Sequence, residues 1–326
     1  MESNHAITMN PLPTPYKIST ITATGSISCN VNLNLFYKYI HVIDVNDLNN
    51  KNDGYLYIEY GKKKAETFCK GFHKKMTVTR RKKQEGKRFD NQATVILRKY
   101  IPESDEFHSA NIKVFRNGNV QMTGLKHIEQ GTWVINYLIQ SIKEMDVKAR
   151  ADNCEELIVD DIHTMKPAAY QICLINSDFR IGFDIKRDKL CKILQTEYGV
   201  LSSYEPCIYP GVKVQYCWNE MHKPQSGVCS CIGPCHGKGT GFGDGKCKRI
   251  TIAVFQSGCI IITGAQTCNQ IDMAYDFICE AIHTHKEEIQ KQKMVPVIEL
   301  APKAARKKVV IQKCNIRVPD GYILEK

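Results

Sequence analysis

The strongest constraint on the fold of this chain is an internal repeat. The segments VFRNGNVQMTG (114–124) and VFQSGCIIITG (254–264) share the pattern V-F-x-x-G-x-x-x-x-T-G at a constant offset of 140 residues. Copies this far apart do not indicate a solenoid, whose short units stack directly on one another. The repeat instead predicts two copies of a half-domain, related by a pseudo-twofold axis.

Each copy has the pattern of a β-hairpin followed by a helix. Apolar residues alternate with mixed ones on both sides of each turn, which is the period of a strand with two different faces. Asn117-Gly118 and Ser257-Gly258 mark the two turns. The following apolar stripes predict helices and consist of Trp133, Val134, Tyr137, Leu138 and Ile142, and of Ile271, Ala274, Phe277, Ile278 and Ile282.

The match between the halves extends upstream. Residues 19–36 and 172–194 each predict a strand followed by a helix, and residues 94–100 and 211–218 each predict a further strand. Each half is therefore expected to contain a strand, a helix, several antiparallel strands and a long helix. Such an α+β arrangement can cover one face of its sheet with helices and leave the other face open.

Segments of both halves resemble the TATA-box-binding protein family. SSYEPCIYPGV (202–212), FQSG (255–258) and ITGA (262–265) are similar to its second repeat, and FDIKRDKL (183–190) fits the strand-to-helix passage of that repeat. STI (19–21), KRF (87–89), VILR (95–98) and FRNG (115–118) are similar to the first repeat. The large insertions resemble the divergent members found in large DNA viruses. The resemblance implies two pseudo-symmetric repeats forming a saddle-shaped antiparallel sheet with helices on its convex face.

The resemblance and the composition together predict the domain organisation. We expect a flexible N-terminus (1–15), a first repeat (16–150) with a basic insertion (51–88), a second repeat (151–285) with a Cys-rich insertion (217–247), and a basic C-terminal tail (286–326). The chain has neither an apolar run long enough to span a bilayer nor an apolar signal region. We therefore expect an intracellular protein with reduced thiols, located in a host nucleus or a cytoplasmic viral factory, with packaging in the virion left open.

The open face of the sheet is expected to bind the minor groove of A·T-rich DNA. Strand alternation places polar and apolar side chains there, namely Thr94, Ile96, Arg98, Lys113, Phe115, Gln121, Thr123, Thr251, Ala253, Phe255, Ile261 and Thr263. The resemblance implies aromatic wedges between base steps at Phe89, Phe115, Tyr209 and Phe255. It also implies a central asparagine in each half that contacts base edges. Asn176 is the candidate in the second half, and the equivalent position in the first half falls near Thr20 or Thr22. The alternative is that these rings are ordinary core aromatics.

A basic segment supplies candidate phosphate contacts. Residues 62–99 contain fourteen Lys and Arg against Glu66, Glu85 and Asp90, which accounts for the whole net charge of +11. The expected phosphate contacts are Arg80, Arg81, Lys82, Lys83, Lys87, Arg88 and Lys126. A solvated loop or a nuclear-import signal is the alternative for the densest part.

A cysteine cluster predicts a metal site in the second half. Cys229, Cys231, Cys235 and Cys247 lie among glycine-rich turns, with Cys217, His222 and His236 nearby. Four thiols can close a tetrahedral zinc site, so we expect one zinc per chain. Free thiols in a glycine-rich loop are the alternative. The insertion lies between two strands, and we expect it to be the loop that flanks DNA in the family.

These features favour a non-enzymatic transcription initiation factor that binds and bends promoter DNA. In the family, the loop matching Glu205 and Ile208 receives the B-type initiation factor, which implies that factor and the RNA polymerase machinery as partners. No P-loop or Rossmann pattern occurs. The alternatives are an architectural or single-strand-binding zinc protein without a promoter role, and a DNA-repair accessory module. Without DNA, an apolar open face favours self-association, so a homodimer also stays open.

Overall fold

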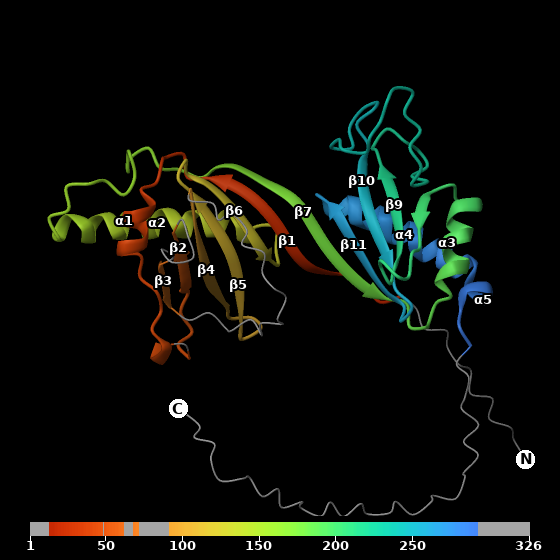
Figure 1. Cartoon of the computed structure of the whole chain (residues 1–326), viewed down its shortest axis with the longest axis horizontal. Helices are drawn as coiled ribbons and strands as arrows, with labels where there is room; N and C mark the ends of the chain where they lie inside the picture. Colours follow the sequence, from red (N-terminus) through yellow and green to blue (C-terminus); the bar gives the residue numbers. More distant parts are fainter. Residues whose placement is uncertain (1–12, 48, 62–67, 72–90, 293–326) are drawn as a thin grey trace, which may run out of the picture. The chain divides into compact units, whose positions relative to one another are not determined.

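The computed structural model describes residues 13–47, 49–61, 68–71 and 91–292 (Figure 1). Their strands form a single 11-stranded sheet in the order β3-β2-β4-β5-β6-β1-β7-β11-β10-β9-β8. All pairings between these strands are antiparallel. The predicted α+β class with one antiparallel sheet is therefore confirmed.

Two successive halves build this sheet. The first comprises β1 (Lys17–Ser26), α1 (Leu33–Tyr39), the short η1 (Val45–Asp47), β2 (Gly54–Tyr60), β3 (Phe68–Gly71), β4 (Gln92–Ile101), β5 (Glu106–Phe115), β6 (Asn119–Leu125) and α2 (Gln130–Ala151). The second comprises β7 (Ala168–Arg180), α3 (Arg187–Thr196), β8 (Leu201–Ser203), β9 (Val212–Trp218), β10 (Lys248–Val254), β11 (Cys259–Ala265), α4 (Cys268–Thr284) and α5 (Lys286–Ile289). The halves meet where β1 pairs with β7.

The two hairpins of the sequence repeat have the same geometry. Val114 pairs with Val120 across the β5–β6 turn, and Val254 pairs with Ile260 across the β10–β11 turn. Gly118 and Gly258 occupy the turns with φ of 74° and 72°, a conformation that glycine adopts without steric cost. The predicted duplication is thus present in the backbone as well as in the sequence.

The core lies between one face of the sheet and the helices. Along β1, for example, Ile21 and Ala23 are fully buried, while Thr22 between them and Thr24 after them are only partly buried. The helices α1 and α2 contact strands of the first half, and α3 and α4 contact strands of the second. Side-chain caps fix where two of these helices begin, because Asn32 accepts from backbone N–H groups of α1 and Thr267 accepts from one of α4. The opposite face of the sheet carries no helix in the described part of the chain.

The structure adds detail to three of the predicted segments. The basic insertion (51–88) contains the strands β2 and β3. Tyr55, Ile58 and Tyr60 of β2 are buried, and its pairing with β4 shifts register between Tyr55 and Tyr57. The N-terminal segment is already anchored at Thr14, whose backbone N–H donates to the carbonyl of Arg180 at 2.8 Å. At the other end, the compact unit continues to residue 291 rather than ending at 285, because Ile289 of α5 is fully buried.

Candidate nucleic-acid interface

The face without helices presents the side chains that strand alternation predicts. In the first half, Gln121 and Thr123 of β6 lie opposite Thr24 and Thr22 of β1, and Lys113 of β5 lies opposite Gln121. These residues alternate with fully or almost fully buried ones in every strand. In the second half, Thr263 of β11 lies between Thr251 of β10 and Asn176 of β7, and Ile261 lies between Ala253 and Asp178 in the same way. Ala253 on this face is only 5% exposed. Small hydroxyl, amide and aliphatic groups therefore occupy most of this surface.

The pairing of the two central strands settles which residue corresponds to Asn176. Asn176 pairs with Thr263 of the repeated hairpin, and Thr22 pairs with the equivalent Thr123. Thr22 is therefore the counterpart of Asn176 in the first half. Thr20 instead makes a structural contact, in which its Oγ1 accepts a hydrogen bond from the backbone N–H of Gly124 at 3.1 Å.

Two aromatic rings form a pair at one end of the second half. The ring centroids of Tyr209 and Phe255 lie 5.8 Å apart with the planes inclined at 59°. Tyr209 is 41% exposed and Phe255 is partly exposed, so neither is a core aromatic. A Cβ on Gly211 would lie 3.0 Å from the Tyr209 ring and 3.2 Å from the Phe255 ring. Glycine at position 211 thus allows both rings to rest against the backbone.

Phe115, the repeat counterpart of Phe255, is also partly exposed. It lines a hollow together with Thr24, Gln121 and Gln171, which come from three different strands. The ring predicted to pair with it, Phe89, lies outside the described residues. So do the predicted phosphate contacts Arg80, Arg81, Lys82, Lys83, Lys87 and Arg88.

Arg98 does not belong to an accessible binding surface, and this prediction was wrong. Its side chain lies on the predicted face but is only 4% exposed. The guanidinium donates to the backbone carbonyls of Asn52 at 3.0 Å and Asn50 at 2.9 Å, and it lies 4.4 Å from the centre of the Phe107 ring. The loop before β2 covers this end of the strand because a guanidinium can satisfy several of its carbonyls at once. Alternation predicts a face, but it does not predict what folds over it.

The remaining predicted contacts lie in exposed segments. The ammonium of Lys126 donates to the backbone carbonyl of Ser19. Ile208 is 79% exposed, and its backbone N–H and that of Tyr209 both donate to the carbonyl of Glu205 at 2.9 Å. The two candidate partner-binding residues therefore lie in one turn with the aromatic Tyr209.

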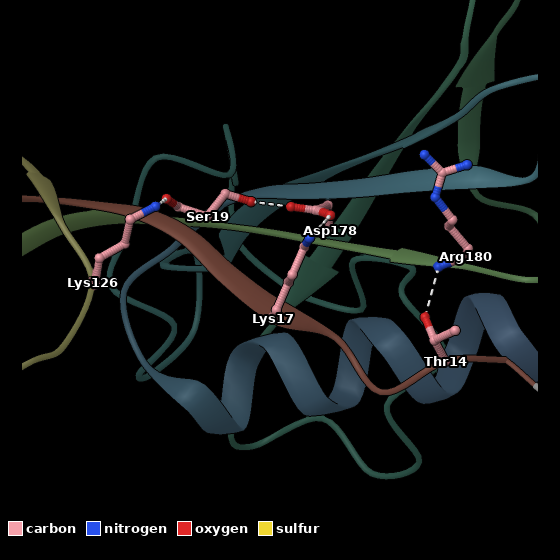
Figure 2. Close-up of polar contacts among 6 residues, drawn as sticks. All are labelled: Thr14, Lys17, Ser19, Lys126, Asp178 and Arg180. Atoms are coloured by element: carbon pink, nitrogen blue, oxygen red, sulfur yellow. Dashed lines mark hydrogen bonds and ion pairs between the residues drawn. The ribbon is translucent and has the colours of Figure 1, made fainter. Parts of the chain in front are cut away.

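An acidic residue on the open face was missed by the sequence analysis. Asp178 of β7 alternates with the buried Ser177 and Phe179, and it accepts a hydrogen bond from the hydroxyl of Ser19 (Figure 2). Its carboxylate also lies 3.7 Å from the ammonium of Lys17. The available signal was its spacing of two residues from Asn176, which places both side chains on the same face.

The four predicted cysteines come together. The Sγ atoms of Cys229, Cys231, Cys235 and Cys247 all lie within 4.8 Å of one another. The Sγ of Cys247 is 3.4 Å from that of Cys231 and 3.7 Å from that of Cys229. Tetrahedral zinc with Zn–S bonds of about 2.3 Å requires S···S separations of about 3.8 Å. The cluster therefore has the composition and the size of a four-thiolate metal site.

Neighbouring groups hold the cluster in shape. The fully buried Asn219 donates from its amide to the Gly243 carbonyl at 2.8 Å and lies 3.5 Å from the Sγ of Cys247. The carboxylate of Asp244 accepts from two backbone N–H groups of the turn between Cys231 and Cys235, and these bonds lower its pKa. A hydrogen bond from the Gly237 backbone lowers the pKa of Cys235 to about 7. One thiol of the cluster is thereby brought close to ionisation at neutral pH.

The Cys-rich insertion, which is predicted to be the loop that flanks DNA, lies away from the aromatic pair. It connects Trp218 at the end of β9 to Lys248 at the start of β10. The aromatic pair lies at the opposite ends of the same strands, where Val212 pairs with Val254. Seven residues of extended strand separate these ends by about 20 Å. Connectivity between two strands does not reveal which end of the sheet a loop occupies until the pairing is known.

The fold and its open face define a class of protein, namely two-repeat α+β proteins with one antiparallel sheet covered by helices on one side. No family model matches the sequence. A TATA-box-binding protein-like protein of Acanthamoeba polyphaga mimivirus is 29% identical over 274 residues, which cover 84% of this chain and 66% of that protein. The predicted resemblance to this family is thereby confirmed, and the chain matches less than two thirds of its viral relative.

A solved archaeal structure also aligns with this chain. Methanococcus jannaschii TBP aligns with 83% of this chain and 99% of its own at 15% identity, with a TM-score of 0.42. None of the described helices is long and apolar enough to cross a membrane.

Proposed function

We propose that this protein binds double-stranded DNA through the open face of its sheet and acts in transcription initiation. The observation that carries the proposal is the exposed pair of Tyr209 and Phe255 beside this face, together with the partly exposed Phe115 at the equivalent place in the other half. Aromatic side chains that insert between base steps unstack them and kink the duplex. The relation to a TATA-box-binding protein-like protein supports the same role.

The chemistry of the face favours the minor groove of A·T-rich DNA. That groove offers the acceptor atoms of adenine and thymine and no amino group. Threonine hydroxyls and the amides of Gln121 and Asn176 can donate to such acceptors, and the small threonine and aliphatic groups allow close approach. Lys113 and Lys126 add positive charge for nearby phosphates.

The proposed role in initiation includes protein partners. The exposed turn with Glu205 and Ile208 is the proposed docking site for a B-type initiation factor, which would in turn bring the RNA polymerase machinery. Its support is the exposure of Ile208 next to an aromatic wedge, where a bound factor would also contact the bent DNA.

The central experiment measures bending directly. A short duplex with an A·T-rich centre and fluorophores at both ends is titrated with protein, and a G·C-rich duplex serves as the control. We expect increased end-to-end energy transfer with the A·T-rich duplex and a much weaker response with the control. Binding without bending, or equal binding to both duplexes, would contradict the proposal and favour a general nucleic-acid-binding role, which binding to single strands would test further.

We further propose that Cys229, Cys231, Cys235 and Cys247 hold one structural zinc ion. Bound zinc would cross-link the glycine-rich insertion and so stabilise its folded form. Metal analysis of the purified protein is expected to give about one zinc per chain. Replacing Cys231 and Cys235 with Ser should abolish binding, whereas Cys154→Ser, outside the cluster, should not. A native protein without metal would refute this assignment.

A further inference from the structure

Asp178 places a negative charge near the centre of a face that otherwise presents mostly neutral or basic groups. It lies in β7, one of the two central strands, opposite Ile261 of β11 and Lys17 of β1. Its neighbours along the strand, Ser177 and Phe179, are buried on the helix side. The carboxylate therefore faces the same side as Asn176 and is 29% exposed.

One oxygen of this carboxylate accepts a hydrogen bond, and the other forms only a long ion pair. The Ser19 hydroxyl donates to Oδ1, which fixes the orientation of the side chain (Figure 2). Oδ2 lies 3.7 Å from the ammonium of Lys17, which is longer than a hydrogen bond. The Lys17 side chain is 78% exposed, so this ion pair is open to solvent. A carboxylate can accept about four hydrogen bonds, which leaves capacity for an external donor.

The corresponding position in the first half carries no charge. Thr22 is the counterpart of Asn176, so the residue two positions further along β1, Thr24, is the counterpart of Asp178. The cross-strand pairs agree with this, because Thr24 pairs with Gln171 as Asp178 pairs with Lys17. The two halves of the face are thus chemically different at this position.

A carboxylate, which only accepts hydrogen bonds, is not complementary to the minor groove of DNA made of A·T pairs alone. Those pairs offer only acceptors in the minor groove, whereas a G·C pair adds the guanine N2 amino group, which is a donor. A buried carboxylate facing acceptors loses its hydration without gaining a hydrogen bond. The same carboxylate facing a guanine amino group gains a charge-assisted hydrogen bond.

We propose that Asp178 recognises the amino group of a guanine, so that the preferred DNA element contains one G·C pair on the side bound by the second half. This inference rests on the proposed binding of the minor groove. Because Thr24 occupies the equivalent position in the first half, the same contact is absent there. The carboxylate therefore also sets the direction in which the protein binds its element.

The test removes or adds one amino group of the DNA at a time. A G·C pair is moved stepwise through an A·T-rich duplex, and at each position guanine is compared with inosine, which lacks only the N2 amino group. At one position the wild-type protein should bind guanine about tenfold or more tightly than inosine, the range of a hydrogen bond to a charged group. Adding the amino group to adenine there, as 2,6-diaminopurine, should also increase affinity.

Two protein variants assign the effect. Asp178→Asn keeps the acceptor for Ser19 but places a donor at the second position, so the preference for guanine should vanish or reverse. Asp188→Asn removes the same charge from the exposed start of α3 and should leave the preference unchanged. The inference is overturned if inosine and guanine bind equally at every position, or if Asp178→Asn retains the difference. Bending of A·T duplexes with no response to inosine would overturn this inference alone, whereas failure to bind any duplex would overturn the proposed function as well.

Discussion

Replacing Phe255 with Ala tests whether its ring is a wedge that inserts into DNA or an aromatic of the hydrophobic core. The Phe255 ring is partly exposed and contacts the more exposed Tyr209, so truncation leaves little enclosed volume. Full truncation of a buried Phe costs about 3–5 kcal/mol of unfolding free energy, and we expect about 1–2 kcal/mol here because solvent already reaches the ring. Phe179, which is 2% exposed, is the matched control and should show the full cost.

On DNA binding, Phe255→Ala should have the larger effect, although its effect on stability is the smaller. Stacking of a base on an aromatic ring contributes about 1–3 kcal/mol by alanine substitution, which corresponds to a loss of about 5- to 150-fold in affinity. Phe255→Ala should therefore weaken binding strongly and reduce bending, and the double variant with Phe115→Ala should abolish bending while remaining folded. Unfolding in urea gives the stability change, and energy transfer on the labelled A·T-rich duplex gives the bend.

Two outcomes would refute this reasoning. If Phe255→Ala bends the duplex like the wild type, the ring is not a wedge. If its loss of stability equals that of Phe179→Ala, the ring belongs to the core, and any loss of binding would follow from damage to the fold.

Three further predictions concern stability. Burial lowers the pKa of His108, so on acidification the unfolded chain binds a proton at this imidazole before the folded chain does. The unfolding free energy should therefore fall as the pH drops below about 6.5. Urea unfolding measured from pH 7.5 to 5.5 should show a weaker dependence of this free energy on pH for His108→Asn. Gly241→Ala should lower the melting temperature more than Gly243→Ala, because both have positive φ but only at Gly241 would the new Cβ meet a ring, that of Trp218 at 2.2 Å; equal effects would contradict this. Ile289→Ala should cost about 2–5 kcal/mol in the same unfolding assay, since this side chain is fully buried, and a change below about 0.5 kcal/mol would show that α5 is not part of the folded unit.

Much of the architecture could be predicted from local patterns. The alternation around Val114 and Val254 identified the hairpins, their strands and the face that each side chain occupies. Turn glycines at 118 and 258 located the bends, because only glycine adopts positive φ without cost. These features depend on residues close in sequence, so their physical causes can be read along the chain.

Other features depend on which distant segments meet. The alternation that placed Arg98 on the open face did not show that the loop 44–53 covers it, since that contact links residues about 50 positions apart. The presence of β2 within the basic insertion likewise depends on the core neighbours of its buried residues, which the composition of the insertion does not reveal.

The sequence by itself determined the duplication, the strand faces, the exposed aromatic positions and the set of four cysteines. Only the tertiary structure decided that the four thiols converge, that their insertion lies at the opposite end of β9 and β10 from Tyr209 and Phe255, and that Asp178 sits beside Ser19 near the centre of the face. The physical reason is the range of the forces involved. Alternation and turn chemistry act between neighbours along the chain, whereas strand register brings together side chains more than a hundred residues apart.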